Sequence, residues 1–355
     1  MYSYHNSTLN QSTSISGTLI DLRSDTVTLP SEDMLKAAYR SPLGDDVYSE
    51  DFTVLELQSF AAEMFHKDSA LFFPSGTQSN LAAILSHCNR GEEALVGREY
   101  HSFSHEAHGA SVLGSVALSP IDTNYNDELT VESLKNEIKP DDSHYPITKL
   151  VCLENTVSGK VQDQHKIDEV CRLAHKSGLK IHLDGARIFH AHVHSGLSLE
   201  SLTSNIDSVS VCLSKGLGSP IGSLLIGNEE LIEKAKRIRK LLGGGMRQVG
   251  IIAGCGLYAL QNNIERLSDD HSNAKRLADG LSTIEQLEVT YEETQTNMVF
   301  IEFSEAIEGE LSRHLFENKV NTTFTSGKSR LVCHMGISTE NIDHIIKCFV
   351  KFFCH

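Results

Sequence analysis

A lysine stands between two apolar segments near the middle of the chain. The β-branched run 208–213 leads into Ser214 and Lys215, and a second apolar run follows a glycine-rich turn at 221–226. Lysine is almost never fully buried unless it has a partner. Two interpretations stay open on these residues alone. Lys215 ends a strand and extends its amine into water, or its amine loses the charge and forms a Schiff base with an aldehyde.

A carboxylate and a guanidinium follow another apolar run. Asp184 comes directly after residues 179–183, and Arg187 lies three positions later. Asp184 either caps the next helix or faces a pyridine nitrogen and keeps that nitrogen protonated. The planar fork of Arg187 suits a carboxylate ligand, with a surface ion pair as the alternative. Both residues are therefore candidates for binding a charged ligand.

A short Ser-Gly-Thr motif lies between an apolar run and a predicted helix, at Ser75, Gly76 and Thr77. Glycine lets the backbone approach a ligand closely. Free amides at a helix N-terminus, together with two hydroxyls, form an anion site. The motif matches neither a Walker A loop nor a G-x-G-x-x-G turn. Taken by itself it is also typical of an ordinary helix N-cap.

These groups all follow predicted strands. Apolar runs alternate with amphipathic helices from about residue 50 to 275, which predicts an α/β fold with a mostly parallel sheet covered on both faces. Ligands of such sheets bind beyond the carboxyl ends of the strands. The polar residues that follow these strands should therefore converge on one cleft; they are Ser75, Gly76, Thr77, Glu154, Asn155, Asp184 and Lys215. An anion cup, a carboxylate for a ring nitrogen and a lysine on a following strand describe a site for pyridoxal 5′-phosphate (PLP).

Histidines follow another predicted strand at 95–96. With a PLP site assumed, His101 is placed to stack on the cofactor and to act as a base. His105 and His108 come soon after it and are interpreted as helix-face residues without a role.

The length of 355 residues and the change of pattern near 280 predict two domains. Residues 1–18 are polar, lack the features of a secretory signal, and are predicted to form a flexible extension. A PLP-binding large domain is expected at 19–275 and a small α+β domain at 276–355. The predicted strands are 70–73, 95–96, 150–153, 179–183, 208–213, 221–226, 289–291, 297–303 and 330–333. The predicted helices include 53–66, 166–177, 305–317 and 339–352.

Composition restricts the partners and the compartment. The chain has 31 basic and 47 acidic side chains and a net charge of −16, which argues against nucleic acid or an anionic membrane as a partner. No apolar run reaches the 18 residues of a membrane-spanning helix. The eight cysteines form no C-x-x-C pair. Free thiols in a reducing cytoplasm are therefore expected, and no metal site is predicted.

Seven ordered segments carry a resemblance that extends from about residue 19 to the end of the chain. The sequence resembles the low-specificity L-threonine aldolases, which are PLP enzymes of fold type I. The resemblance implies a retro-aldol cleavage of L-threonine, L-allo-threonine and related β-hydroxy amino acids to glycine and an aldehyde. The segments that carry it are 21–28, 44–51, 74–78, 183–189, 212–218, 243–248 and 330–334.

The resemblance also implies the roles of individual residues. Lys215 would hold the cofactor covalently, Asp184 would pair with its pyridine nitrogen, and His101 would stack on its ring. The family forms tetramers with active sites at subunit interfaces, so a homotetramer is expected. The predicted cofactor-binding residues are Gly76, Thr77, His101, Asp184, Arg187, Ser214 and Lys215, with Lys240 and Arg247 reaching the phosphate of a neighbouring subunit. The predicted ligands of the substrate carboxylate are Ser24, Arg187 and Arg330.

Two positions depart from the family pattern. Residues 154–159 usually read Glu-Asn-Thr-His-Asn-Gly in the family, and here Val157 replaces the histidine. Phe52 replaces a proline. Val157 keeps other PLP reactions open, such as β-elimination, racemisation or cleavage of bulkier β-hydroxy amino acids, with His105 or His108 as substitute imidazoles. A non-catalytic PLP-fold binding protein is the other alternative. A nicotinamide-dependent oxidoreductase lacks its G-x-G-x-x-G turn.

Overall fold

A computed structural model describes residues 19–354. They form two compact units, one of residues 28–268 and the other of residues 19–27 with 269–354. The predicted extension at 1–18 lies outside the described residues.

The N-terminal segment belongs to the smaller unit, whereas the sequence analysis assigned it to the large domain. The reason is a short parallel pairing of β1 (Ile20–Asp21) with β11 (Val320–Asn321). Two-residue strands carry no periodic pattern, so the sequence alone gives no sign of this pairing.

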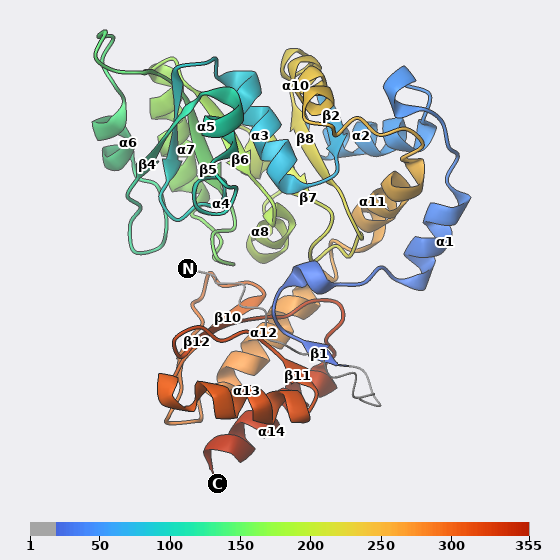
Figure 1. The fold of residues 1–355 in the computed structure, drawn as a ribbon, viewed down its shortest axis with the longest axis vertical. Helices are drawn as coiled ribbons and strands as arrows, with labels where there is room; N and C mark the ends of the chain where they lie inside the picture. The colour runs from blue at the N-terminus through green and yellow to red at the C-terminus, as the bar shows by residue number, and fades with distance from the viewer. Residues whose placement is uncertain (1–18, 355) are drawn as a thin grey trace. The chain divides into compact units, whose positions relative to one another are not determined.

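The larger unit is built on a seven-stranded sheet, shown with its covering helices in Figure 1. β8 runs antiparallel to both of its neighbours, and the other neighbouring strands pair in parallel. The predicted α/β fold with a mostly parallel sheet is therefore confirmed. The strands, in their order across the sheet, are β2 (Ser69–Phe73), β8 (Ser223–Gly227), β7 (Ser208–Cys212), β6 (Lys180–Asp184), β5 (Ile147–Glu154), β3 (Glu92–Gly97) and β4 (Ala117–Ile121).

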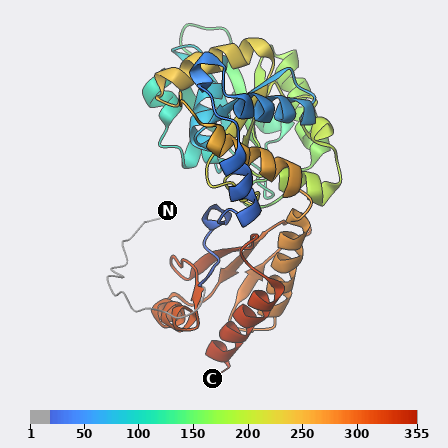
Figure 2. The ribbon, with the colours of Figure 1, turned by 90° about the vertical axis from the view of Figure 1, so that its right-hand side faces the viewer.

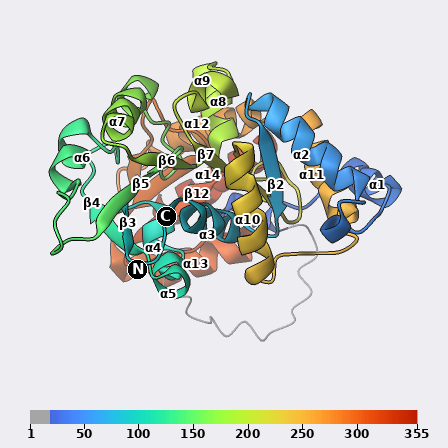
Figure 3. The same cartoon turned by 90° about the horizontal axis from the view of Figure 1, so that it is seen from above.

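Helices cover both faces of this sheet. Figure 3 shows α3 (Gly76–His87) and α10 (Glu229–Leu241) on one face, with α2 (Phe52–Met64) and α7 (Gln164–Lys176) on the other. Gly178 follows α7 with a φ of 75°, the left-handed conformation that a C-cap glycine adopts. The other helices of this unit are α1 (Glu32–Arg40), α4 (His101–Ser104), α5 (Gly109–Gly114), α6 (Val131–Glu137), α8 (Ile188–Ser195), α9 (Leu199–Thr203) and α11 (Gly250–Asn262).

Burial of two central strands and a buried ion pair hold the sheet and its helices together. Every residue of β7 and of β8 is buried, as expected for strands covered on both faces. Arg239, on α10, is 3% exposed; it donates to Asp46 Oδ2 at 2.8 Å and to the Phe72 carbonyl at 2.6 Å. A buried charge needs such partners. The two hydrogen bonds hold α10 against β2 and against the segment that contains Asp46.

The smaller unit has a three-stranded antiparallel sheet ordered β12–β10–β9, and its residues 269–354 are orange and red in Figure 2. Its apolar core combines residues from both the strands and the helices. The predicted α+β character of this segment agrees with these elements. The strands are β9 (Glu288–Thr290), β10 (Met298–Glu302) and β12 (Lys328–Val332), and the helices are α12 (Leu267–Leu281), α13 (Glu308–Glu317) and α14 (Thr339–Phe353).

All eight cysteines are free, seven of them buried and Cys354 exposed, in agreement with the expectation of free thiols. None of the helices in residues 19–354 combines the length and the apolar character needed to span a bilayer.

Candidate active site

The predicted groups stand at one edge of the large sheet. Glu154 and Asp184 are the last residues of β5 and β6 and are partners in the strand register. Asp184 is in turn the register partner of Ser210 in β7, and Lys215 follows β7 by three residues. His101 begins α4, shortly after β3. The convergence predicted from the strand ends therefore agrees with the topology.

Asp184 is 3% exposed and accepts hydrogen bonds at both oxygens. Its Oδ1 accepts from the Ala186 amide at 3.0 Å, and its Oδ2 accepts from Asn80 Nδ2 at 2.8 Å. Asn80 Nδ2 also donates to Glu106 Oε1 at 2.9 Å. One amide group therefore joins two carboxylates at the centre of the site.

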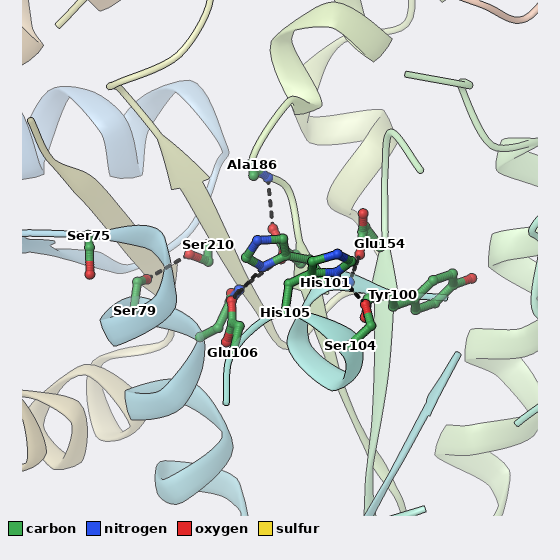
Figure 4. A network of polar contacts seen from close by, with 12 residues as sticks. Ser75, Ser79, Tyr100, His101, Ser104, His105, Glu106, Glu154, Ala186 and Ser210 are labelled. Atoms are coloured by element: carbon green, nitrogen blue, oxygen red, sulfur yellow. Dashed lines mark hydrogen bonds and ion pairs between the residues drawn. The ribbon is translucent and has the colours of Figure 1, made fainter. Parts of the chain in front are cut away.

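His101 lies between two glutamates (Figure 4). Its Nδ1 is 2.9 Å from Glu106 Oε1, and its backbone amide donates to Glu154 Oε2 at 2.6 Å. The His105 ring lies nearly parallel to the His101 ring, with centroids 5.5 Å apart and planes at 16°. His101 is thus fixed at its backbone and at one ring nitrogen.

Charge is concentrated at this edge of the sheet. Loss of water, followed by the nearby Asp184 carboxylate, raises the pKa of Glu154 to about 8, against the opposing effect of Lys215 and Arg187. Loss of water and Asp184 also raise the pKa of Glu106, against the hydrogen bonds from His101 and Asn80. Perturbed carboxyl groups clustered with a lysine and an arginine are typical of a functional site.

The helix that follows β2 offers the predicted anion cup. Ser75 Oγ accepts from the Gln78 amide at 3.2 Å, so Ser75 is the N-cap and Gly76 and Thr77 occupy the first turn of α3. Amides of a first turn have no carbonyl within the helix to donate to. A Cβ at Gly76 would stand 2.7 Å from Cys212 Sγ, so the cup tolerates no side chain there. These features fit a phosphate group.

Lys215 and Arg187 line one small pocket. Its wall also includes Cys212, whose sulfur faces Gly76, and His190. Cys212 therefore connects the pocket of Lys215 and Arg187 with the N-terminus of α3. Ser214 precedes Lys215 and is half-buried.

The remaining predicted residues lie on other elements of the two units. Arg247 is exposed and pairs with Asp45 at 3.0 Å, and Lys240 lies 3.0 Å from the position of a Cβ at Gly245. Ser24 and Arg330 belong to the smaller unit, where Arg330 is half-buried in β12. Their predicted roles at the substrate stay predictions.

The structure shows the surroundings of Val157 and of the two histidines considered as substitutes for the family histidine. Val157 is 2% exposed within an apolar cluster that includes Tyr100 and Leu150, so no titratable group stands at this position. His108 packs edge-on against Phe103, with ring centroids 4.9 Å apart. His105 is the second imidazole that lies beside His101.

Asn80 and Glu106 were missed by the sequence analysis. Asn80 lies one helical turn after Gly76, on the face of α3 that meets the sheet, and this spacing is the signal that could have found it. Glu106 sits among histidines in a short segment without periodicity. Its partner Asn80 is 26 residues away, so local pattern gives no indication of the contact.

Comparisons with known proteins agree with this geometry. The β-eliminating lyase family profile matches residues 21–304. The low-specificity L-threonine aldolase of Escherichia coli K12 is 46% identical over 327 residues, covering 92% of this chain and 97% of the relative. The chain belongs to the β-eliminating lyase family and, within it, to the low-specificity L-threonine aldolases. An Arabidopsis thaliana relative named probable low-specificity L-threonine aldolase 2 is 39% identical, covering 94% of this chain and 97% of its own length.

The fold of this threonine aldolase family member is also found in solved structures. The threonine aldolase of Leishmania major superposes with a TM-score of 0.81 at 19% identity, covering 94% of this chain and 99% of that chain. This likeness confirms the predicted fold type I.

Buried neutral histidines behind the site predict a loss of stability in acid. Burial lowers the pKa of His182 to about 4, below the 6.5 of an exposed histidine. The unfolded chain therefore binds a proton below pH 6.5 that the folded state excludes until about pH 4. The stabilisation is complete above pH 6.5 and is lost as the pH falls, by about 3 kcal/mol for this group.

Urea unfolding of the protein at pH 7 and at pH 4.5 would measure this loss. The matched variant His182→Gln has no titrating group there, so its free energy of unfolding should decrease less between the two pH values. Equal decreases in the two proteins would contradict the assignment.

Proposed function

We propose that this protein is a PLP-dependent carbon–carbon lyase that cleaves L-threonine, L-allo-threonine and related β-hydroxy amino acids to glycine and an aldehyde. The observation that carries the proposal is the placement of Lys215, Asp184 and His101 at one sheet edge in a chain of the threonine aldolase family. A protein that only binds amino acids needs no amine, ring-facing carboxylate and histidine together.

The residues present fit PLP. The amides of Gly76 and Thr77 suit its phosphate, Ser214 is proposed as a further cofactor ligand, and the buried Asp184 carboxylate suits a protonated pyridine nitrogen. The Lys215 amine suits its aldehyde. When bound, PLP supplies an electron sink for the pair released at Cα. We propose Lys240 and Arg247 as ligands of a phosphate in a neighbouring subunit.

The protein contributes orientation. Arg187 binds the substrate carboxylate through its planar fork, and Ser24 and Arg330 are proposed as further ligands of that group. Fixing the carboxylate sets the direction of the Cα–Cβ bond before it breaks. Orientation of this kind supplies up to ~7–11 kcal/mol of a barrier.

His101 is the proposed base. The Glu106 carboxylate accepts from Nδ1–H, which leaves the Nε2 lone pair free. His101, or a water that it holds, takes the proton of the β-hydroxyl as the Cα–Cβ bond breaks and the aldehyde leaves. Return of a proton to Cα gives glycine. His105, stacked beside His101, stands where a second imidazole would influence this proton.

Association into a homotetramer with active sites at subunit interfaces is part of the proposal. Large exposed patches of apolar side chains commonly mark protein interfaces. Exposed large apolar residues are concentrated in the segment around α1 and the start of α2, with Tyr39 88% and Phe52 69% exposed. The other exposed apolar residues of this segment are Leu29, Leu35, Leu43, Tyr48 and Leu55.

A cytoplasmic location is proposed because all eight cysteines are free.

Product identification tests the function. Incubation of the PLP-loaded protein with L-threonine should release acetaldehyde, measured with coupled alcohol dehydrogenase, and equimolar glycine. A panel of β-hydroxy amino acids then gives the preferred substrate from the aldehydes released. Ammonia and a keto acid, or racemised threonine, in place of acetaldehyde would assign the protein to one of the other PLP reactions that Val157 keeps open.

A further inference from the structure

A row of hydrogen-bonded side chains runs behind the site, between α3 and the sheet. His182 Nε2 lies 3.1 Å from Asn80 Oδ1, and His182 Nδ1 lies 2.9 Å from Ser208 Oγ. Ser208 Oγ lies 2.8 Å from His87 Nε2. Asn80, His182 and Ser208 are each at most 2% exposed. We call these four residues, His87, Ser208, His182 and Asn80, the histidine row.

The secondary structure explains why the row is continuous. Asn80 and His87 are seven residues apart on α3, so they lie two turns apart on one face of the helix. His182 and Ser208 are register partners on the neighbouring strands β6 and β7. Each end of the row therefore comes from the helix and its middle from the sheet.

The direction of each hydrogen bond follows from Asn80. Its side-chain nitrogen lies between the carboxylates of Asp184 and Glu106, where only a donor is favourable, so its oxygen faces His182. An amide oxygen only accepts, and His182 Nε2 must therefore carry a hydrogen. Burial lowers the pKa of His182 to about 4, so the ring is neutral near pH 7 and Nδ1 is bare.

The rest of the row is then determined. The bare Nδ1 of His182 accepts the single hydroxyl hydrogen of Ser208. The Ser208 oxygen in turn accepts from His87 Nε2–H, and burial lowers the pKa of His87 to about 3, so this ring is neutral too. Every donor in the row points toward Asn80, and Asn80 donates to the two carboxylates.

We propose that His182, in its Nε2–H form, is a positioning residue that orients the Asn80 amide so that it donates to Asp184 and Glu106. The inference rests on the proposed PLP function, because Asp184 is the group that faces the cofactor ring. Without the His182 donor, the Asn80 amide can rotate and present its oxygen to the carboxylates. Asp184 would then lose a donor and face a repulsive oxygen, which weakens its pairing with a ring nitrogen.

Nitrogen-15 NMR of the cofactor-free protein tests the proton arrangement directly. The His182 imidazole should give the signals of the neutral Nε2–H tautomer between pH 6 and 8, assigned by their absence in His182→Gln. A Nδ1–H tautomer or an imidazolium in this range would overturn the proposal. This measurement does not depend on PLP binding, so it stays decisive if the proposed function fails.

Two variants test the consequence at the cofactor. His182→Phe keeps an aromatic ring but loses the donor, and His182→Gln keeps a side-chain N–H that can donate to Asn80. The dissociation constant of PLP, from titration of the cofactor-free protein, should rise about tenfold or more in His182→Phe, the factor that a hydrogen bond to a charged group supplies. It should rise less than about threefold in His182→Gln. The surface variant His165→Phe controls for the loss of one histidine.

The outcomes separate the proposal from a structural role and from failure of the function. Rescue by Gln but not by Phe supports positioning, whereas equal weakening by both variants, or normal PLP binding in His182→Phe, overturns it. If His182→Phe does not fold, the tautomer of the wild-type ring and the PLP affinity of His182→Gln decide. A wild-type protein that binds no PLP contradicts the proposed function, while the NMR result still tests the row.

Discussion

Replacing Lys215 by alanine is expected to remove cofactor-dependent threonine cleavage, with a decrease in kcat of at least about a thousandfold. A side chain that forms a covalent intermediate cannot be replaced by a group that makes only contacts. The visible absorbance of the bound cofactor should change at the same time. Lys215 is the only lysine among the described residues that line the pocket it shares with Arg187, so no other amine there replaces it. Absorbance spectra and acetaldehyde release from purified proteins measure both effects.

A matched lysine supplies the control. Lys176 is exposed at the end of α7, and Lys176→Ala should keep both the spectrum and the rate. Retention of the wild-type spectrum by Lys215→Ala would contradict the assignment of Lys215, and with it the cofactor site.

Asp184→Asn should lower kcat by about a hundredfold and weaken PLP binding. Asparagine is isosteric but carries no charge to stabilise a protonated ring nitrogen. Both Asp184 oxygens accept hydrogen bonds, from the Ala186 amide and from Asn80 Nδ2. An asparagine must turn its NH₂ group toward one of these donors, which costs a further ~1–3 kcal/mol of stability.

Asp184→Glu separates charge from position, since it keeps the charge and moves it by one methylene. Activity, PLP affinity and thermal unfolding are compared for the two variants. An Asp184→Asn enzyme with wild-type kcat and PLP affinity would show that Asp184 does not face the cofactor.

The sequence predicted the sheet and the main chemical groups because both depend on local pattern. Asp184 and Lys215 are polar residues at the ends of apolar strands, and the topology of a parallel sheet brings such ends together. Ser75 was recognisable as an N-cap before α3. The principal residues of the site could therefore be proposed without a structure.

Other features needed the structure, for physical reasons. β4 contains Pro120 and only its last residue is buried, so its pattern lacks the continuous apolar character of the other strands. Asn80 meets Asp184 across 104 residues, and His182 meets Asn80 across 102. Hydrogen bonds between such distant side chains follow from tertiary packing and leave no periodic signal in the sequence.

Helix α3 carries several groups of the site on one face, and this restricts the mutations that its sequence tolerates. Its first turn forms the anion cup, its second turn carries Asn80, and its last residue is His87. An insertion or deletion within the helix would rotate the groups that follow it by about 100° per residue relative to those that precede it, since the helix has 3.6 residues per turn. Sequence variation in α3 is thus confined to substitutions, and its length is expected to be invariant in functional descendants of this chain.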